Sequence, residues 1–283
     1  MKQTQRSWII TGVSSGFGRH LSEQLLARGD RVVGTVRQTD AAADLVKSHP
    51  GLFRAEILDV TNNVAIRDVV DRTFARLGRV DVVVSNAGYG LFGAAEEYSD
   101  EQIRHIIDTN LIGSIELIRA ALPHLRAQGG GRIIQMSSYG GQVAGPGTSM
   151  YHATKWGIEG FAEAVAAEVA PFNIGVTLVE PGGAHTEFRF GSAQIAPPIA
   201  DYDGTPAHAF RSLLDPARKE PGDPAKIATT TTIIASVDQE PAPLRLLLGS
   251  DAYQRTHQVL ADRLAALEAQ KALAATTDFT GEY

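Results

Sequence analysis

Seven short runs of β-branched and other apolar residues recur along the 283-residue chain, and helical patterns separate them. The runs cover residues 7–11, 31–36, 52–58, 80–85, 132–136, 174–179 and 244–248, and the helical patterns cover 17–28, 64–77, 100–127, 150–170 and 252–274. Some runs, such as Val82, Val83 and Val84, are apolar at successive positions, which is typical of strands covered on both faces. This alternation predicts an α/β fold: a doubly wound, seven-stranded parallel sheet of Rossmann type with helices on both faces. Ligands of such sheets bind beyond the carboxyl ends of the strands.

One segment departs from the alternation. Residues 187–224 contain six prolines and few periodic apolar residues. An irregular segment of this length is usually either a binding loop or disordered. We interpret 187–224 as a substrate-binding lid with an apolar surface that includes Phe188, Phe190 and Phe210. No internal repeat or hinge-like linker divides residues 1–283, so we expect one domain.

Composition excludes several classes of protein. The chain has no cysteine, which removes disulfide scaffolds and thiolate metal sites, and no histidine spacing suggests another metal site. The 26 basic and 32 acidic side chains leave a net charge of −6, without the basic footprint of a nucleic-acid binder. The first residues lack a signal-peptide core, and the longest uncharged stretch, residues 133–154, is interrupted by Gly, Ser, Gln and Pro. We therefore expect a cytoplasmic protein with no nucleic-acid or membrane partner.

A glycine-rich loop, TGVSSGFG at residues 11–18, directly follows the first predicted strand and leads into a helix. Gly12, Gly16 and Gly18 suit a backbone that turns sharply and approaches a phosphate held at a helix N-terminus. A tight turn without a ligand is the simpler alternative. The same letters also match G-x-S-x-G, the nucleophile elbow of serine hydrolases. An elbow needs earlier strands and an oxyanion loop, and only 11 residues precede Gly12, so we favour a dinucleotide site.

The end of the second predicted strand bears on the choice of dinucleotide. A site selective for NAD places an acidic residue about 20 residues beyond the glycine loop. Residues 33–37 contain no acid, and Arg37 stands at that point instead. A guanidinium can pair with a 2′-phosphate, so we expect NADP(H) to be preferred while NAD(H) stays possible. The alternative is a solvated arginine at the end of a strand.

A second group of residues can move a proton. Tyr151 and Lys155 are four residues apart and therefore lie on one face of a helix. A phenol titrates near ~10 and becomes a useful acid or base at neutral pH only when a neighbouring cation favours its anion. Ser138 follows the fifth predicted strand, and its hydroxyl can bond a substrate carbonyl at the same edge of the sheet.

In order and spacing these motifs resemble the short-chain dehydrogenase/reductase family. The resemblance rests on TGVSSGFG at 11–18, Asp59-Val60, the segment Ser85-Asn86-Ala87-Gly88, Asn110, Ser138, Tyr151-His152-Ala153-Thr154-Lys155 and Pro181-Gly182. Ser85 departs from the family pattern, in which Asn is commoner. The motif NAGYGLFG at 86–93, together with Arg37 and the motif PLRLLLG at 243–249, resembles the sequences of the subgroup of 17β-hydroxysteroid and retinol dehydrogenases.

The resemblance implies a role for each matching residue. Tyr151 would be the acid/base, Lys155 would lower its pKa and hold the nicotinamide ribose, Ser138 would orient the reacting oxygen, and Asn110 would anchor a water in a proton relay. The implied cofactor contacts are Gly12, Ser14, Ser15, Gly16, Phe17 and Gly18 in the glycine loop, Arg37, Asp59 and Val60 around the adenosine, Asn86, Ala87 and Gly88 along the cofactor, Tyr151 and Lys155, and Pro181, Gly182 and Thr186 on the nicotinamide side.

The sequence thus predicts an NADP(H)-dependent oxidoreductase that interconverts an alcohol and a ketone or aldehyde. We expect an apolar small-molecule substrate with a carbonyl or alcohol group, and a homodimer or homotetramer formed through the long helices at 100–127 and 150–170. The competing interpretation is a non-catalytic regulatory protein that binds a nicotinamide dinucleotide. Such a protein has no reason to keep Ser138, Tyr151 and Lys155 together, which favours the enzyme.

Overall fold

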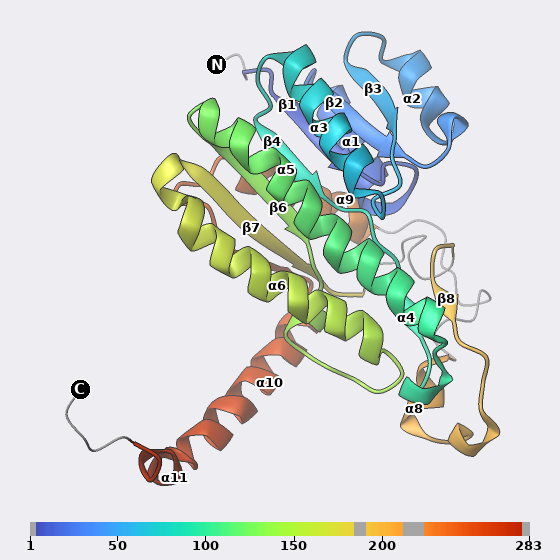
Figure 1. Cartoon of the computed structure of the whole chain (residues 1–283), viewed down its shortest axis with the longest axis vertical. Coiled ribbons are helices and arrows are strands. Elements are labelled where there is room, and N and C mark those ends of the chain that lie inside the picture. Colours follow the sequence, from blue (N-terminus) through green and yellow to red (C-terminus); the bar gives the residue numbers. More distant parts are fainter. Residues whose placement is uncertain (1–3, 184–190, 212–223, 279–283) are drawn as a thin grey trace.

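The computed structural model describes residues 4–183, 191–211 and 224–278. Within them, seven parallel strands form one twisted sheet in the order β3-β2-β1-β4-β6-β7-β9 (Figure 1). The strands are β1 (Ser7–Thr11), β2 (Arg31–Val36), β3 (Phe53–Ile57), β4 (Val82–Ser85), β6 (Gly131–Met136), β7 (Ile174–Pro181) and β9 (Arg245–Leu248). The predicted doubly wound sheet is therefore confirmed, and each strand lies within two residues of its expected position.

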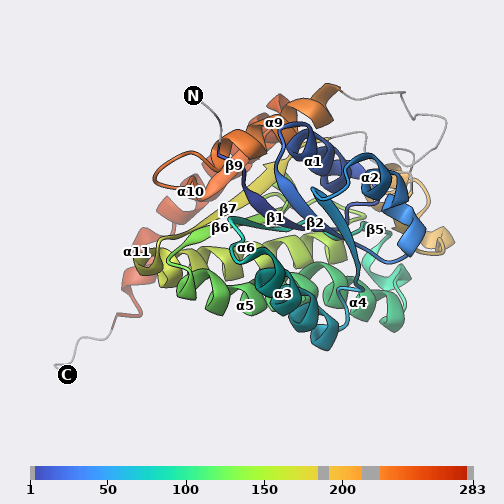
Figure 2. The ribbon, with the colours of Figure 1, turned by 90° about the horizontal axis from the view of Figure 1, so that it is seen from above.

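Both faces of the sheet are covered by helices (Figure 2). The helices α3 (Asn63–Leu77), α5 (Gly113–Ala127) and α6 (Ser149–Val169) cover one face, and α1 (Gly16–Ala27), α2 (Ala43–Ser48) and α9 (Pro224–Ser236) cover the other. Strand β1 is apolar at three successive positions because its two faces pack into different cores. Ile9 packs into the core under α3, α5 and α6, whereas Trp8 and Ile10 pack into the core under α1, α2 and α9. Each such aliphatic side chain contributes roughly 1.5–3 kcal/mol when it is fully buried.

The order in which the chain adds strands to the sheet reverses at β1: β2 and β3 lie on one side of it, and β4 and the later strands lie on the other. This strand pairs with β2 on one side and with β4 on the other, and the helix that follows β1 covers a different face from the helices that follow β3 and β4. The loops at the carboxyl ends of β1 and β4 therefore diverge and open a crevice between them. The glycine loop and the Asn86 segment lie on its two sides.

The helix expected at 100–127 runs without a break, but it is not a uniform α-helix. It consists of α4 (Asp100–Ile107), a π-helical turn (Asp108–Ile112) and α5. A π-helical turn inserts one extra residue into a helix and occurs frequently at functional sites. Asn110 lies in this turn, and the helical pattern of the sequence does not show that the turn is there.

Part of the expected lid lies outside the described residues, namely 187–190 and 212–223. The part that the structure describes, residues 191–211, is named the outer segment here. It is more regular than expected, since β8 (Gln194–Ile195) pairs with β5 (Leu91–Phe92) and is followed by a 3-10 turn (Ala200–Tyr202) and by α8 (Pro206–Ala209). Two of the six prolines in 187–224, Pro206 and Pro224, begin α8 and α9, a position that proline favours.

The C-terminal helix divides in two, α10 (Ser250–Glu268) and α11 (Lys271–Ala275), where one helix at 252–274 was expected. It projects from the body of the protein (Figure 1).

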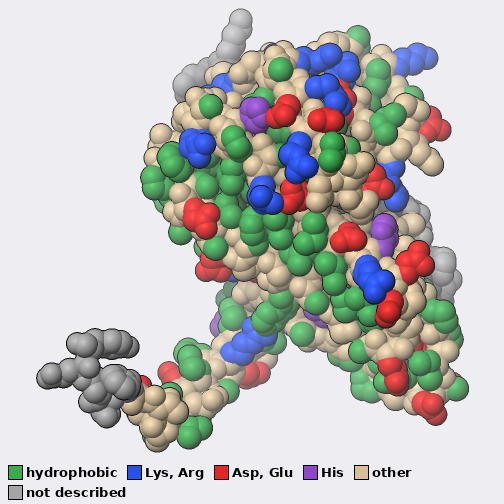
Figure 3. All heavy atoms as spheres, viewed as in Figure 1, with side chains coloured by type: hydrophobic (Ala, Val, Ile, Leu, Met, Phe, Trp, Pro, Cys, Tyr) green, Lys and Arg blue, Asp and Glu red, His purple; other side chains and the backbone are tan. Residues whose placement is uncertain are grey.

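Hydrophobic side chains gather over α5 and α6 on the face shown in Figure 3. Among the described residues, no helix combines the length and the apolar character needed to cross a membrane.

Candidate active site

A cavity of about 930 Å³ opens at the carboxyl edge of the sheet, between the crevice and the outer segment. Sixteen of the expected site residues line it: Gly12, Ser14, Ser15, Gly16, Phe17, Arg37, Asp59, Val60, Asn86, Ala87, Gly88, Ser138, Tyr151, Lys155, Pro181 and Gly182. Gly18 and Asn110 are not part of the lining, and Thr186 falls outside the described residues. Residues that are far apart in the chain meet here because parallel strands end at the same edge.

The glycine loop turns sharply after β1. Gly12 and Gly16 have φ angles of +72° and +59°, a region that glycine adopts far more readily than other residues. Gly18 supports the turn, since a Cβ on it would lie 2.3 Å from the carbonyl oxygen of Gly12. The loop leads into α1, whose first turn contains no acidic side chain. The helix dipole and the free amides of this turn therefore favour an anion.

Asn86 fastens the glycine loop to the end of β4. Its side-chain amide donates to the carbonyl oxygens of Thr11 and Gly12, at 2.8 and 3.1 Å. In return the hydroxyl of Thr11 accepts hydrogen bonds from the amides of Asn86 and Ala87, at 2.9 and 3.0 Å. These four bonds hold the two sides of the crevice in one arrangement.

Arg37 and Asp59 lie at the end of the cavity formed by β2 and β3. Asp59 accepts hydrogen bonds from the amide and hydroxyl of Thr61, at 2.9 and 2.8 Å. The Thr61 amide is the main cause that lowers the pKa of Asp59, and the charge of Arg37 adds to it. Within the described residues Arg37 forms no ion pair of 4.0 Å or less, so its guanidinium is available for a phosphate.

Tyr151 and Lys155 project from the first turns of α6. Burial raises the pKa of Tyr151 to about 12, although its hydrogen bond with Ser138 acts in the opposite direction. Burial also lowers the pKa of Lys155 to about 8, against the attraction of Glu159. The Lys155 ammonium donates to the carbonyl oxygen of Met136 at 2.9 Å and lies 5.7 Å from the centroid of the Tyr151 ring. Burial is the main cause of the raised pKa of Tyr151, and the role that the resemblance implies for Lys155 stays a prediction.

The side chain of Asn110 is hydrogen-bonded to the backbone of Tyr89. Its side-chain oxygen accepts from the amide of Tyr89 at 3.0 Å, and its side-chain nitrogen donates to the carbonyl of Tyr89 at 2.8 Å. The residue is only 1% exposed. Its side chain is therefore committed to holding the chain after Gly88 in place.

Comparison with known proteins agrees with this geometry. A family profile described as short chain dehydrogenase matches residues 6–194, more than half of the chain. The chain belongs to the short-chain dehydrogenase/reductase family. An oxidoreductase of Botryotinia fuckeliana is 36% identical over 249 residues, which are 87% of this chain and 90% of that protein.

Two further similarities extend the match. The human 17β-hydroxysteroid dehydrogenase type 1 is 32% identical over 211 residues, 71% of this chain and 63% of that enzyme, which confirms the resemblance to its subgroup. A solved short-chain dehydrogenase from Streptomyces avermitilis is 39% identical and superimposes with a TM-score of 0.90, covering 98% of this chain and 100% of its own. The protein is accordingly an oxidoreductase of this family that acts on CH–OH groups.

Behind the lysine of this dehydrogenase/reductase lies a buried polar group that sequence reasoning missed. Glu159, one helical turn beyond Lys155, accepts a hydrogen bond from the Ser137 hydroxyl at 2.6 Å. A Cβ on Gly141 would lie 2.0 Å from the same carboxylate, so the loop that contains Ser138 packs directly against Glu159. The spacing of four residues from Lys155 was the available signal.

The C-terminal helix α10 also reaches the cavity, which the sequence did not indicate. Asp251 accepts a hydrogen bond from the amide of Gly183 at 2.9 Å and thereby orients the chain after β7. Arg255 lines the cavity and lies 5.9 Å from the centroid of the Tyr139 ring. The first turns of α10 therefore belong to the site, although the rest of the helix projects away from it.

Proposed function

We propose that the protein is an NADP(H)-dependent oxidoreductase that interconverts an alcohol and a ketone or aldehyde, with Tyr151 as the acid/base. One observation carries the proposal: Ser138, Tyr151 and Lys155 line the same cavity as the glycine loop. A hydroxyl pair that can hold a carbonyl oxygen thus lies in reach of a dinucleotide that extends along the crevice.

The residues present fit such a cofactor. Gly12 and Gly16 open the loop for a pyrophosphate at the N-terminus of α1, and side chains at Gly18 would collide with the loop. Arg37 is available for a 2′-phosphate, which supports NADP(H) over NAD(H). Asp59 and Val60 would contact the adenine, and Pro181 and Gly182 would face the nicotinamide. When bound, the nicotinamide supplies or accepts a hydride.

The chain's own groups would handle the proton. In reduction the Tyr151 hydroxyl donates its proton to the developing alkoxide oxygen, while Ser138 donates a hydrogen bond to the same oxygen. Lys155 supplies positive charge beside Tyr151 once the proton has left. Asn110 would hold the chain after Gly88 in place through its two hydrogen bonds with the backbone of Tyr89. Because Tyr151 carries its proton at neutral pH, it is already in the state that reduction requires.

Apolar side chains of β5, of the loop before α6 and of the outer segment line another part of the cavity. Phe92, Val143, Pro146 and Phe210 all line it. They would accept an uncharged, apolar carbonyl compound or alcohol. A polar or charged group placed against these four side chains would lose hydration without gaining a hydrogen bond from them.

We propose a homodimer or homotetramer formed through α5 and α6. The hydrophobic side chains over these helices support it (Figure 3). Two of the exposed aromatic residues nearby are Trp156 and Phe172, at 41% and 43% exposure. Light scattering on the purified protein tests this, and a monomer at micromolar concentration would contradict it.

Substitution of Tyr151 by Phe tests the reaction. We expect Tyr151→Phe to bind NADPH, measured by fluorescence titration, and to reduce no ketone or aldehyde of a broad panel. Tyr139→Phe, a second tyrosine of the cavity wall, is the matched control and should retain turnover. A wild type that binds NADPH and reduces nothing would favour the regulatory protein instead.

The choice of cofactor has its own test. Arg37→Asp should weaken NADPH relative to NADH by roughly 10-fold or more, because it replaces a phosphate partner by a like charge. An unchanged ratio of the two dissociation constants would contradict the role given to Arg37.

A further inference from the structure

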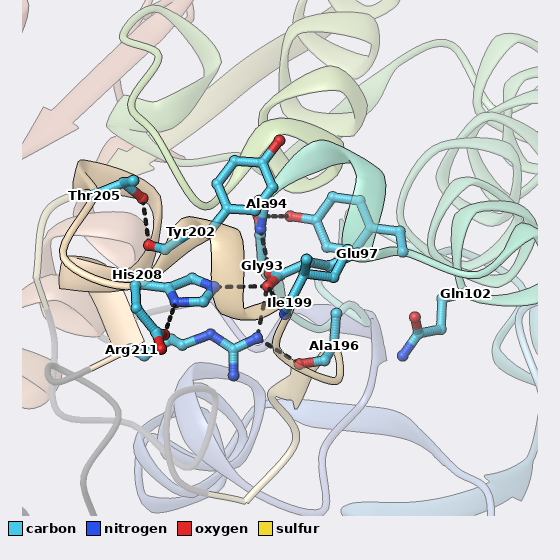
Figure 4. A network of polar contacts seen from close by, with 12 residues as sticks. Gly93, Ala94, Glu97, Gln102, Ala196, Ile199, Tyr202, Thr205, His208 and Arg211 are labelled. Atoms are coloured by element: carbon cyan, nitrogen blue, oxygen red, sulfur yellow. Dashed lines mark hydrogen bonds and ion pairs between the residues drawn. The ribbon is translucent and has the colours of Figure 1, made fainter.

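Glu97 is a buried carboxylate outside the cavity whose partners explain the position of the outer segment (Figure 4). It ends a 3-10 turn (Ala95–Glu97) that follows β5, and its side chain is 0% exposed. A charge without solvent is tolerated only when hydrogen-bond donors surround it. The origin of those donors is therefore informative.

Four donors converge on the two oxygens of Glu97. They are the amides of Ala94 at 2.7 Å and Ile199 at 2.8 Å, the Nε2 atom of His208 at 2.6 Å and a guanidinium nitrogen of Arg211 at 3.2 Å. Burial alone would favour the neutral acid, but these bonds outweigh it and lower the pKa of Glu97 to about 2. Glu97 is thus an anion, and each of its two oxygens accepts two hydrogen bonds.

Three of the four donors belong to the outer segment. The same nitrogen of Arg211 also donates to the carbonyl oxygen of Ala196 at 2.6 Å, so Arg211 ties the segment to itself and to Glu97. His208 further contacts Asp203 at 3.1 Å. One carboxylate therefore holds Ile199 near the start of residues 196–211 and both His208 and Arg211 near their end, and this arrangement is named the Glu97 clamp.

The clamped residues form a wall of the substrate cavity. Pro206, Ala209 and Phe210 line the cavity, whereas Glu97 does not. The ring of Phe210 stacks on that of Phe92, with centroids 5.3 Å apart and planes at 25°. On its other side, α8 packs so closely on Gly147 that a Cβ there would lie 2.6 Å from the carbonyl oxygen of Ala207.

We propose that Glu97 is a positioning residue that fixes α8 and Phe210 as the outer wall of the cavity and so determines which carbonyl compounds the enzyme accepts. The inference rests on the proposed function and names its substrate class: uncharged, bulky apolar carbonyl compounds, whose ring or chain contacts the Phe92–Phe210 pair. A small ketone bound at Ser138 and Tyr151 would not reach that wall. The clamp therefore acts on binding of large substrates and leaves the proton chemistry unchanged.

The decisive variant is Glu97→Gln. Its amide NH₂ group would replace one accepting oxygen of the carboxylate and would face the groups that donate to Glu97. Glu101→Gln, an exposed carboxylate of the following helix, is the matched control. The probes are acetone as the small ketone and 2-tetralone as the bulky one, both with NADPH. We expect kcat/KM for 2-tetralone to fall by roughly 10-fold or more through KM, and that for acetone to change by less than about 3-fold. Phe210→Ala should reproduce this pattern without disturbing the clamp.

Amide hydrogen exchange gives a readout that does not depend on turnover. In Glu97→Gln, exchange at residues 196–211 should accelerate, while exchange in the sheet and the affinity for NADPH stay as in the wild type. Unchanged exchange at 196–211, or an equal loss for both ketones, would overturn the proposal. If Glu97→Gln does not fold, His208→Ala removes one donor and should shift the same readouts in the same direction. If the wild type reduces no ketone or aldehyde of the broad panel, the proposed function fails and exchange alone decides the clamp.

Discussion

Glu180 gives the sharpest test of the buried charges near the site. It lies in β7 with a side chain that is 0% exposed, accepts a hydrogen bond from Gln142 and has the Nε atom of Arg245 3.1 Å away. Burial, followed by repulsion from Glu159, raises its pKa from 4.5 to about 7. The folded protein therefore binds this proton more tightly than the unfolded chain does.

The sign and size of the effect follow from linkage. The stability that this group confers is fully present below pH 4.5 and is lost as the pH rises to about 7, because only the unfolded chain releases the proton in that window. The pKa difference corresponds to at most about 3 kcal/mol of unfolding free energy. Glu180→Gln cannot ionise, so its stability relative to the wild type should rise by up to about 3 kcal/mol between pH 5 and pH 8.

Urea unfolding at the two pH values, followed by tryptophan fluorescence, measures this difference. Glu163→Gln is the matched control, because Glu163 also pairs with Arg245, at 2.8 Å, but its side chain is 54% exposed. An exposed pair contributes ~0–1 kcal/mol, so the control should show little dependence on pH. If both variants differ from the wild type by the same amount at pH 5 and pH 8, the reasoning about Glu180 is refuted.

Three further substitutions have definite expected outcomes. Gly18→Ala should weaken NADPH binding by roughly 100-fold in a fluorescence titration, since its Cβ would lie 2.3 Å from the Gly12 oxygen; unchanged affinity would contradict the loop geometry. Gly160→Ala, in the same protein, has no atom within 4 Å of the new Cβ and should raise the unfolding free energy by roughly 0.5–1 kcal/mol, measured with urea; a loss would show a contact that the structure lacks. Glu159→Gln keeps a partner for Ser137 but removes the anion that favours the Lys155 ammonium, so the alkaline limb of the kcat profile should move to lower pH; an unmoved limb would exclude the electrostatic role.

Much of the fold was predictable because its signals are local. Strands such as β1 and β4 are buried on both faces, and each is apolar at successive positions in its own short segment. Once their order is that of a doubly wound sheet, topology brings Gly12, Asn86 and Tyr151 to one edge. The candidate site therefore followed from short motifs and strand ends.

The remainder depends on contacts that no local pattern contains. Glu97 reads as one more acid in Ala95–Glu97, yet its partners Ile199, His208 and Arg211 are 102 to 114 residues away. The same holds for β5 and β8, two-residue strands that exist because they pair with each other. In the part of 187–224 that the structure describes, residues 196–211 are held by a buried carboxylate elsewhere in the chain, which no local pattern shows.

The two shifts at Tyr151 and Lys155 give the proposed reaction a dependence on pH in each direction. Burial moves both groups toward their neutral forms, raising the pKa of Tyr151 to about 12 and lowering that of Lys155 to about 8. At pH 7 the tyrosine therefore carries its proton and the lysine is still largely an ammonium, which is the arrangement that reduction needs. Oxidation of an alcohol requires the tyrosinate, whose fraction grows about tenfold for each pH unit below the pKa. Above pH 8 that gain is opposed by loss of the Lys155 charge, so the oxidative rate should rise more steeply below pH 8 than above it.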